Sequence, residues 1–239
     1  MKILLIAGHG AGDPGAVCGA YKEADETRNM VGLLRPILEQ RGISVGVYPA
    51  SRNAYADYKA GTLRATAHAE LYDYVLEIHF NACTVDHGDG KTKGVECYVN
   101  SSESGIGVEN AICDALHGLG FTNRGVKRYD KWAVIKSCKN AGTSSALLEV
   151  CFIDDADDMK IYTKSRERVA EAIANGICEG FGIPYKEVPA VAKTDMEIAK
   201  ELAVAKGIIK GNGSGDMMWD KPMTREQLVT VLYRLGVLK

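Results

Sequence analysis

Short runs of apolar residues alternate along the chain with longer stretches in which apolar residues recur every three or four positions. The short runs are typical of strands covered on both faces, and the longer pattern predicts amphipathic helices. The predicted strands are 3–7, 44–48, 74–79, 95–99, 132–135 and 146–150, and the predicted helices are 25–41, 63–71, 107–119 and 159–181. This alternation predicts an α/β fold with a single mostly parallel or mixed sheet, flanked by helices.

The pattern changes after residue 184. The stretch 184–193 contains Pro184 and Pro189 and shows no periodicity, which indicates a linker at 185–193 between a domain at 1–184 and a small helical module at 194–239. Two capping boxes predict the helix starts of this module, Thr194 with Glu197 and Thr224 with Gln227. Because so short a module has little core, we expect it to pack on a neighbour or on another copy of itself.

Composition narrows the function classes. The chain of 239 residues has a formal net charge of −2, so it lacks the basic footprint of a nucleic-acid-binding protein. No apolar run is long enough to cross a membrane, and the short run at 3–7 is read as a strand, not a signal peptide. The seven cysteines show no C-x-x-C spacing. We therefore expect reduced, buried thiols and synthesis in the cytoplasm.

Residues whose side chains can bind metals or transfer protons lie at or near the ends of predicted strands. His9 follows the first strand within a glycine-rich loop at 8–16, His79 ends another strand, and Glu149 lies in the last. In an open α/β sheet, ligands bind outside the carboxyl ends of the strands. One histidine after a strand is usually structural, but two at strand ends favour a metal site.

A catalytic zinc ion takes three protein ligands and leaves one position for water. The two histidines supply two of these ligands, and the chain offers four carboxylates near them for the third: Glu23, Asp25, Glu26 and Glu77. Glu77 lies two residues before His79, about 6–7 Å back along the strand, which suits an outer position better than direct coordination. Spacing alone does not decide among the other three. The remaining histidines, His68, His87 and His117, are read as surface or packing residues.

Four separated motifs resemble the zinc-dependent N-acetylmuramoyl-L-alanine amidases of the amidase type 3 family. In chain order they are Gly8-His9-Gly10 with Asp13-Pro14-Gly15-Ala16, Lys22-Glu23, Ile78-His79-Phe80-Asn81-Ala82, and Leu147-Leu148-Glu149-Val150-Cys151-Phe152-Ile153. The segment Asn123-Arg124-Gly125-Val126-Lys127 also looks like the family. The resemblance covers about residues 1–183 and implies one sheet of about six strands with surrounding helices.

The resemblance implies a role for individual residues. His9, Glu23 and His79 correspond to the family's ligands for one zinc ion, and Glu149 to its catalytic glutamate. Asn81 and Arg124 are expected to bind substrate. One position departs from the family pattern, because Thr27 stands where the family often has asparagine.

The function implied is hydrolysis of the peptidoglycan amide between N-acetylmuramic acid and L-alanine. Zinc lowers the pKa of a bound water to about 7, and a carboxylate placed as Glu149 is expected can act as general base. A zinc peptidase is a rival hypothesis, although a two-metal version needs more ligands than these motifs offer. A non-catalytic wall-binding protein with a degenerate site is another.

The C-terminal residues 195–239 resemble a single S-layer homology motif, a module that anchors proteins to anionic secondary wall polymers. Arg225 is the residue expected to contact such a polymer, because a guanidinium suits anionic sugars. The module is otherwise expected to mediate homo-oligomerisation. A catalytic domain followed by a wall-binding module resembles a phage endolysin of a Gram-positive host, which reaches the wall after the membrane is permeabilised. A host autolysin of the same chemistry is the alternative.

Overall fold

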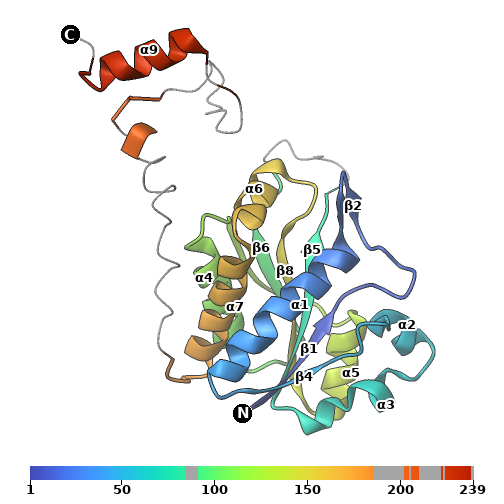
Figure 1. Cartoon of the computed structure of the whole chain (residues 1–239). Coiled ribbons are helices and arrows are strands. Elements are labelled where there is room, and N and C mark those ends of the chain that lie inside the picture. Colours follow the sequence, from blue (N-terminus) through green and yellow to red (C-terminus); the bar gives the residue numbers. More distant parts are fainter. Residues whose placement is uncertain (84–90, 186–201, 205, 210–221, 223, 238–239) are drawn as a thin grey trace. The chain divides into compact units, whose positions relative to one another are not determined.

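The computed structural model describes residues 1–83, 91–185, 202–204, 206–209, 222 and 224–237 (Figure 1). The chain divides into two compact units, Met1–Lys186 and Glu187–Lys239. Apart from Tyr185, the predicted linker at 185–193 lies outside the described residues, as does the predicted capping box at Thr194.

The first unit is built on a six-stranded sheet with the strand order β4-β1-β5-β8-β6-β7. Strands β4, β1, β5 and β8 run parallel to one another, whereas β6 is antiparallel to β8 and β7 is parallel to β6. The strands are β1 Lys2–Ala7, β4 Ser44–Val47, β5 Tyr74–Asn81, β6 Val95–Val99, β7 Asn123–Arg128 and β8 Ser144–Phe152. A separate two-stranded ribbon consists of β2 Val17–Cys18 and β3 Tyr21–Lys22. The predicted α/β class with a mixed sheet is confirmed.

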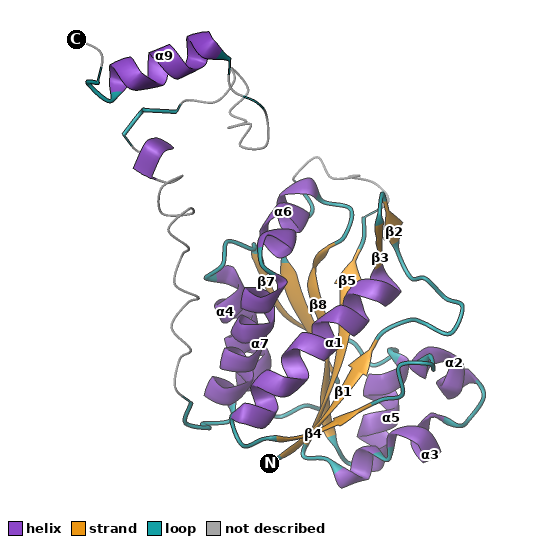
Figure 2. Cartoon of the chain, viewed as in Figure 1, coloured by secondary structure: helices purple, strands orange, loops and turns teal. Residues whose placement is uncertain are grey.

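Helices cover the sheet on both faces (Figures 1 and 2). Helices α1 Glu23–Gln40, α4 Gly107–His117 and α7 Arg166–Gly180 pack on one face. On the other face lie α2 Ala54–Lys59, α3 Leu63–Ala67 with the 3₁₀ turn η1 Ala69–Leu71, and α5 Ala133–Ala141. Helix α6 Ala156–Lys164 follows β8.

Alternation along the strands creates the two cores. In β1 and β5, Leu5 and Leu76 point into the core beneath α1, α4 and α7, while their neighbours Leu4 and Val75 pack with α2, α3 and α5. All four side chains are at most 2% exposed. Because both faces are covered, these strands are continuously apolar, which is the pattern that made them recognisable in the sequence.

Two predicted elements are wrong. The predicted strand at 132–135 is the start of α5, which ends before Gly142, a residue in the left-handed conformation (φ 77°). Val134 and Cys138 lie four positions apart and pack together in the second core, so the run obeys a helical period. The predicted single helix at 159–181 is two helices, α6 and α7, interrupted at the extended residue Ser165.

The hydrophobic pattern also misplaced some helix boundaries and missed several short elements. The first helix begins at Glu23, two residues earlier than predicted, and the predicted helix at 63–71 is interrupted by His68 with a positive φ of 46°. Helix α2, strand β7 and the β2–β3 ribbon were not predicted. Strand β7 has the sequence NRGVKR, in which one apolar side chain among charged ones gives no strand signal.

In the second unit, the described helical residues are 202–204 and helix α9 Arg225–Arg234. Its predicted capping box is present, with Thr224 and Gln227 exchanging side-chain and backbone hydrogen bonds. No residue of α9 is buried. Arg234 donates a hydrogen bond to the carbonyl of Ile208 at 2.8 Å.

All seven cysteines are free, as predicted, and five of them are buried; Cys18 and Cys83 are partly exposed. Within the described residues, no helix is both long enough and apolar enough to traverse a bilayer.

Helix α1 is anchored to α7 by Glu26, a buried carboxylate that accepts two hydrogen bonds from Arg166 and one from Tyr162. Burial raises the pKa of Glu26, but the bonds from Arg166 and Tyr162 outweigh it and the pKa is lowered overall. Because hydrogen bonds to charged groups contribute about 1.5–3 kcal/mol, Glu26→Gln should destabilise the protein by about 2 kcal/mol at pH 7.

The difference in unfolding free energy between the wild type and Glu26→Gln should shrink as the pH falls. A carboxyl with a lowered folded-state pKa stabilises above its unfolded pKa, and this contribution disappears as pH falls through the folded value. Urea unfolding of both proteins between pH 7 and pH 3 should therefore show the gap narrowing below about pH 4.5. A gap that stays constant over this range would contradict the role of the Glu26 charge.

Candidate metal and catalytic site

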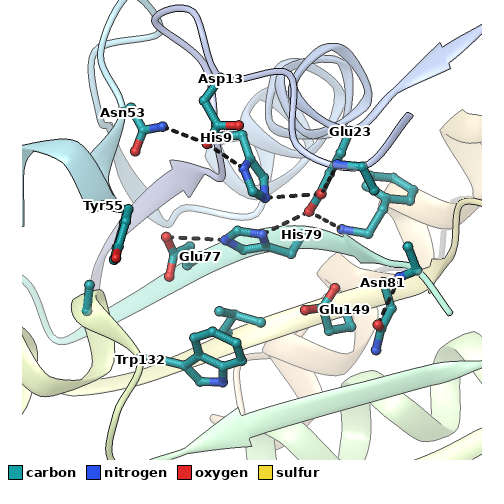
Figure 3. Close-up of a pocket in the computed structure, with 15 residues that line it drawn as sticks. His9, Asp13, Glu23, Asn53, Tyr55, Glu77, His79, Asn81, Trp132 and Glu149 are labelled. Atoms are coloured by element: carbon teal, nitrogen blue, oxygen red, sulfur yellow. Dashed lines mark hydrogen bonds and ion pairs between the residues drawn. The ribbon is translucent and has the colours of Figure 1, made fainter. Parts of the chain in front are cut away.

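The carboxyl ends of β1 and β5 and the start of α1 meet at one pocket of about 480 Å³ (Figure 3). His9 follows β1 with only Gly8 between them, and His79 lies two residues before the end of β5. Glu23 is the first residue of α1 and is 4% exposed. The ligand atoms of these three residues all lie within 4.8 Å of one another.

Glu23 stands between the two histidines. Its Oε2 lies 3.0 Å from His9 Nε2, and its Oε1 lies 2.9 Å from His79 Nδ1. Backbone N–H groups of Ala16 and Phe80 donate to the same two oxygens, each at 3.0 Å. Both carboxylate oxygens are thereby fixed, so the side chain cannot turn away from the imidazoles.

The outer nitrogen of each imidazole faces a second carboxylate. His9 Nδ1 lies 2.9 Å from Asp13, which also accepts a hydrogen bond from Asn53 at 3.1 Å. His79 Nε2 lies 3.3 Å from Glu77. Histidines that bind metals almost always donate their other ring N–H to a carboxylate, a carbonyl or water, which fixes the ring and its tautomer. The arrangement therefore fits a metal ion held by His9 Nε2, His79 Nδ1 and Glu23.

Charge follows the same geometry. Burial raises the pKa of Glu23, but the bonds with His79 and His9 hold it well below its usual range. Burial lowers the pKa of His79, yet Glu77 and Glu23 raise it well above the ordinary value. The site thus gathers negative charge around two imidazoles, which is the environment a cation requires. Two imidazoles and one carboxylate are also the donor set of many catalytic zinc sites.

The other carboxylates proposed as ligands from the sequence lie elsewhere. Asp25 is exposed, and Glu26 is engaged with Arg166 and Tyr162. Glu77 contacts His79 but not the other two members of the group, in keeping with its predicted outer position. Of the four alternatives, the structure brings only Glu23 between the histidines.

Glu149 lies on β8 beside the histidine pair. It is the register partner of His79 on the adjacent strand, lines the same pocket and is 9% exposed. Strand β8 continues to Phe152, so Glu149 is inside the strand and not at its end as the sequence suggested. Burial raises the pKa of Glu149 to about 7, a shift that the charge of His79 opposes and that of Glu23 assists. One of its oxygens is buried without a hydrogen-bond partner among the described residues.

Two of the remaining predicted site residues share one hydrogen-bond acceptor, and the third lies in the second unit. Asn81 lines the pocket and donates to Glu96 at 2.9 Å. Arg124 lies on β7 and also donates to Glu96, at 2.6 Å. Arg225 is exposed at the first position of α9, in the second unit.

Sequence reasoning missed the residues that hold the His9 loop. The guanidinium of Arg28, on α1, donates to the carbonyls of Gly8 and His9 at 3.0 and 2.9 Å. It also donates to the carbonyls of Ala50 and Arg52, from the segment that precedes α2. His9 has a positive φ of 59°, a costly conformation for a residue with a side chain, so these bonds hold a strained loop.

Thr27, the residue that departs from the family pattern, contacts the end of β1. Its hydroxyl lies within hydrogen-bonding distance of two carbonyl acceptors, those of Gly8 at 2.9 Å and Ala24 at 3.1 Å. The threonine thus links the start of α1 to the end of β1. A glycine is required at position 8, because a Cβ there would lie 2.3 Å from His79 Cε1.

Comparison with known proteins assigns the chain to a protein family. The family model for N-acetylmuramoyl-L-alanine amidase matches residues 3–179. The chain belongs to this amidase family. The match includes His9, Glu23, His79 and Glu149, so all four residues of the described geometry lie within the domain that the family shares.

Individual relatives agree with the family match. An uncharacterised protein of Clostridium perfringens is 28% identical over 182 residues, which are 75% of this chain and 52% of that protein. The germination-specific N-acetylmuramoyl-L-alanine amidase of Bacillus subtilis is 28% identical over 196 residues, covering 75% of this chain and 79% of the relative. The chain thus spans about half the length of the first relative.

A solved structure shows the same fold. The catalytic domain of the CD27L endolysin targeting Clostridia difficile superposes with a TM-score of 0.61 at 25% identity, covering 74% of this chain and 96% of that domain.

Replacing Arg28 tests whether its hydrogen bonds to the His9 loop position His9 for metal binding. Arg28→Met should weaken zinc binding by at least about 10-fold, because substitutions in the shell around metal ligands typically cost 10–100-fold in affinity. Competition with a chromophoric chelator measures the affinity. Arg35→Met is the matched control, since Arg35 is on the same helix and makes an exposed ion pair with Glu39. Wild-type zinc affinity in a folded Arg28→Met protein would refute the positioning role.

Proposed function

We propose that this amidase family member hydrolyses the amide between N-acetylmuramic acid and L-alanine in peptidoglycan, with one zinc ion held by His9, Glu23 and His79. The observation that carries the proposal is the fixed triangle of these three residues beside the buried carboxyl of Glu149. When bound, zinc supplies a Lewis acid that polarises the amide carbonyl and makes water a better nucleophile.

The protein side chains then have distinct tasks. Glu149 takes a proton from the attacking water and returns it to the alanine nitrogen as the carbon–nitrogen bond breaks. A carboxyl with a pKa of about 7 suits both transfers, because a group titrating near the working pH can accept and donate. Asp13 and Glu77 hold the imidazoles in orientation through their outer nitrogens. The products are a free muramoyl carboxyl and a peptide with a free alanine amino terminus.

The proposal extends to the biological setting. The similarity to the catalytic domain of an endolysin and the S-layer-homology-like residues 195–239 support a phage endolysin that meets the wall after membrane permeabilisation. In this role the C-terminal module binds an anionic secondary wall polymer through Arg225 or associates with a second copy. The similarity to a germination-specific amidase favours a host enzyme of the same chemistry as the second candidate.

Digestion of purified sacculi separates the proposed chemistry from its rivals. New alanine amino termini should appear without new reducing sugars, and turnover should be lost on chelation and restored by zinc. Amino termini of other residues would identify a peptidase, and the absence of any release would identify a binding protein. Turbidity loss of walls from several Gram-positive genera, with and without residues 195–239, tests the contribution of the module.

Glu149→Gln should abolish turnover while keeping zinc at about one per chain, because the amide preserves shape but cannot accept the proton. We expect a loss of at least about 100-fold in kcat, the lower end for general acid–base catalysis. Metal content by atomic absorption and unfolding temperature serve as controls for folding. Near-wild-type activity in this variant would remove Glu149 from the mechanism.

A further inference from the structure

A second polar cluster adjoins the site on β6 and β7. Glu96 of β6 is the register partner of Glu149 on β8, so the two side chains lie next to each other on the same face of the sheet. Glu96 is 1% exposed and belongs to neither the proposed metal ligands nor the proton transfers. A carboxylate buried this deeply requires partners, and those partners define the cluster.

Four side chains donate to Glu96. They are Asn81 at 2.9 Å, Tyr98 at 2.8 Å, Arg124 at 2.6 Å and Lys127. Burial raises the pKa of Glu96, but the bonds from Lys127 and Arg124 outweigh it and lower the pKa overall. Two cations therefore share a single carboxylate, and the cluster carries an excess of one positive charge.

The two cations remain accessible. The side chains of Arg124 and Lys127 are 29% and 39% exposed, whereas Glu96 beneath them is covered. Arg124 uses its Nε on Glu96 and lies 5.0 Å from the Phe152 ring, so its position is fixed. No acceptor among the described residues takes its two Nη groups. A held guanidinium with free N–H groups is suited to a carboxylate.

The cluster lies close enough to Glu149 for a peptide whose amide is at Glu149 to reach it. Glu149 is on β8, Glu96 on the adjacent strand and Arg124 on the strand after that. Because neighbouring strands lie about 4.8 Å apart, Arg124 lies about 10 Å from Glu149 measured between backbones. An extended peptide covers this distance in about three residues, and the Arg124 side chain covers part of it, so a carboxylate on the residue that follows alanine comes within reach. Asn81 joins the two places, since it lines the pocket and donates to Glu96.

We propose that Arg124 and Lys127, held by Glu96, form a subsite for a carboxylate of the stem peptide and thereby set the orientation of the substrate. The inference rests on the proposed amidase function. Before cleavage the muramoyl carboxyl group is part of the amide bond and carries no charge. The carboxylates near the reacting bond are therefore on the peptide side. The subsite therefore directs the peptide across β6 and β7.

The test compares two soluble muropeptides that differ in one group. One carries a free carboxylate on the residue that follows alanine, and in the other this carboxylate is amidated. Wild-type kcat/KM should favour the free acid by about 10-fold. Arg124→Gln should lower kcat/KM for the free acid by about 10-fold and change it less than 2-fold for the amide. Lys127→Gln should act in the same direction.

Arg128→Gln is the matched control on the same strand, because among the described residues Arg128 donates only to the carbonyls of residues 100, 101 and 103. It should leave the preference for the free acid unchanged. Equal losses on both muropeptides in Arg124→Gln, or no preference in the wild type, would overturn the subsite and leave Glu96 with a structural role.

Calorimetric binding of both muropeptides to Glu149→Gln separates this proposal from the proposed function. A preference for the free acid that disappears when Arg124→Gln is added supports the subsite even if the wild type fails to cleave either compound. Cleavage of both compounds with equal binding would refute the subsite while the amidase function stands. Absence of binding and of cleavage would refute both.

Discussion

The interaction on which the site depends is the placement of one buried carboxylate, Glu23, between two imidazoles. Each oxygen of Glu23 faces one histidine and accepts one backbone N–H. Burying a charge is costly unless it is paired, so Glu23 and the histidines require each other in the absence of a cation. A metal ion held by these three side chains would take the place of this pairing. The close-up in Figure 3 shows the three side chains converging from the loop after β1, the start of α1 and strand β5.

The scaffold around this group explains why it is precise. His9 lies on a loop with positive φ angles at His9, Gly10, Ala11, Gly12 and Gly15, which would not hold this shape without support. Arg28 and Thr27 supply that support from α1, the helix that also begins with Glu23. A single helix therefore delivers one ligand and fixes the loop of another. Preorganisation of this kind is what metal sites and catalytic sites need.

Much of this could be predicted from the sequence, for identifiable reasons. Strands covered on both faces are continuously apolar, so β1, β5, β6 and most of β8 were recognisable, and the two histidines followed from their positions at strand ends. Glu23 could not be separated from Asp25 and Glu26 by spacing, because the three differ only in helical phase and only the resemblance favoured one. Trp132 to Ile135 suggested a strand because the apolar run is short. Arg28, Glu96 and Asp13 act through contacts distant along the chain or within an irregular loop, which periodicity does not encode.

A crystal structure of the zinc-loaded protein, with anomalous diffraction collected on both sides of the zinc edge, tests the central claim most directly. The account predicts one strong anomalous peak with His9 Nε2, His79 Nδ1 and a Glu23 oxygen at about 2.0–2.2 Å. A peak coordinated by other residues, such as the cysteines, or a zinc-soaked crystal without any peak at these three side chains, would contradict it.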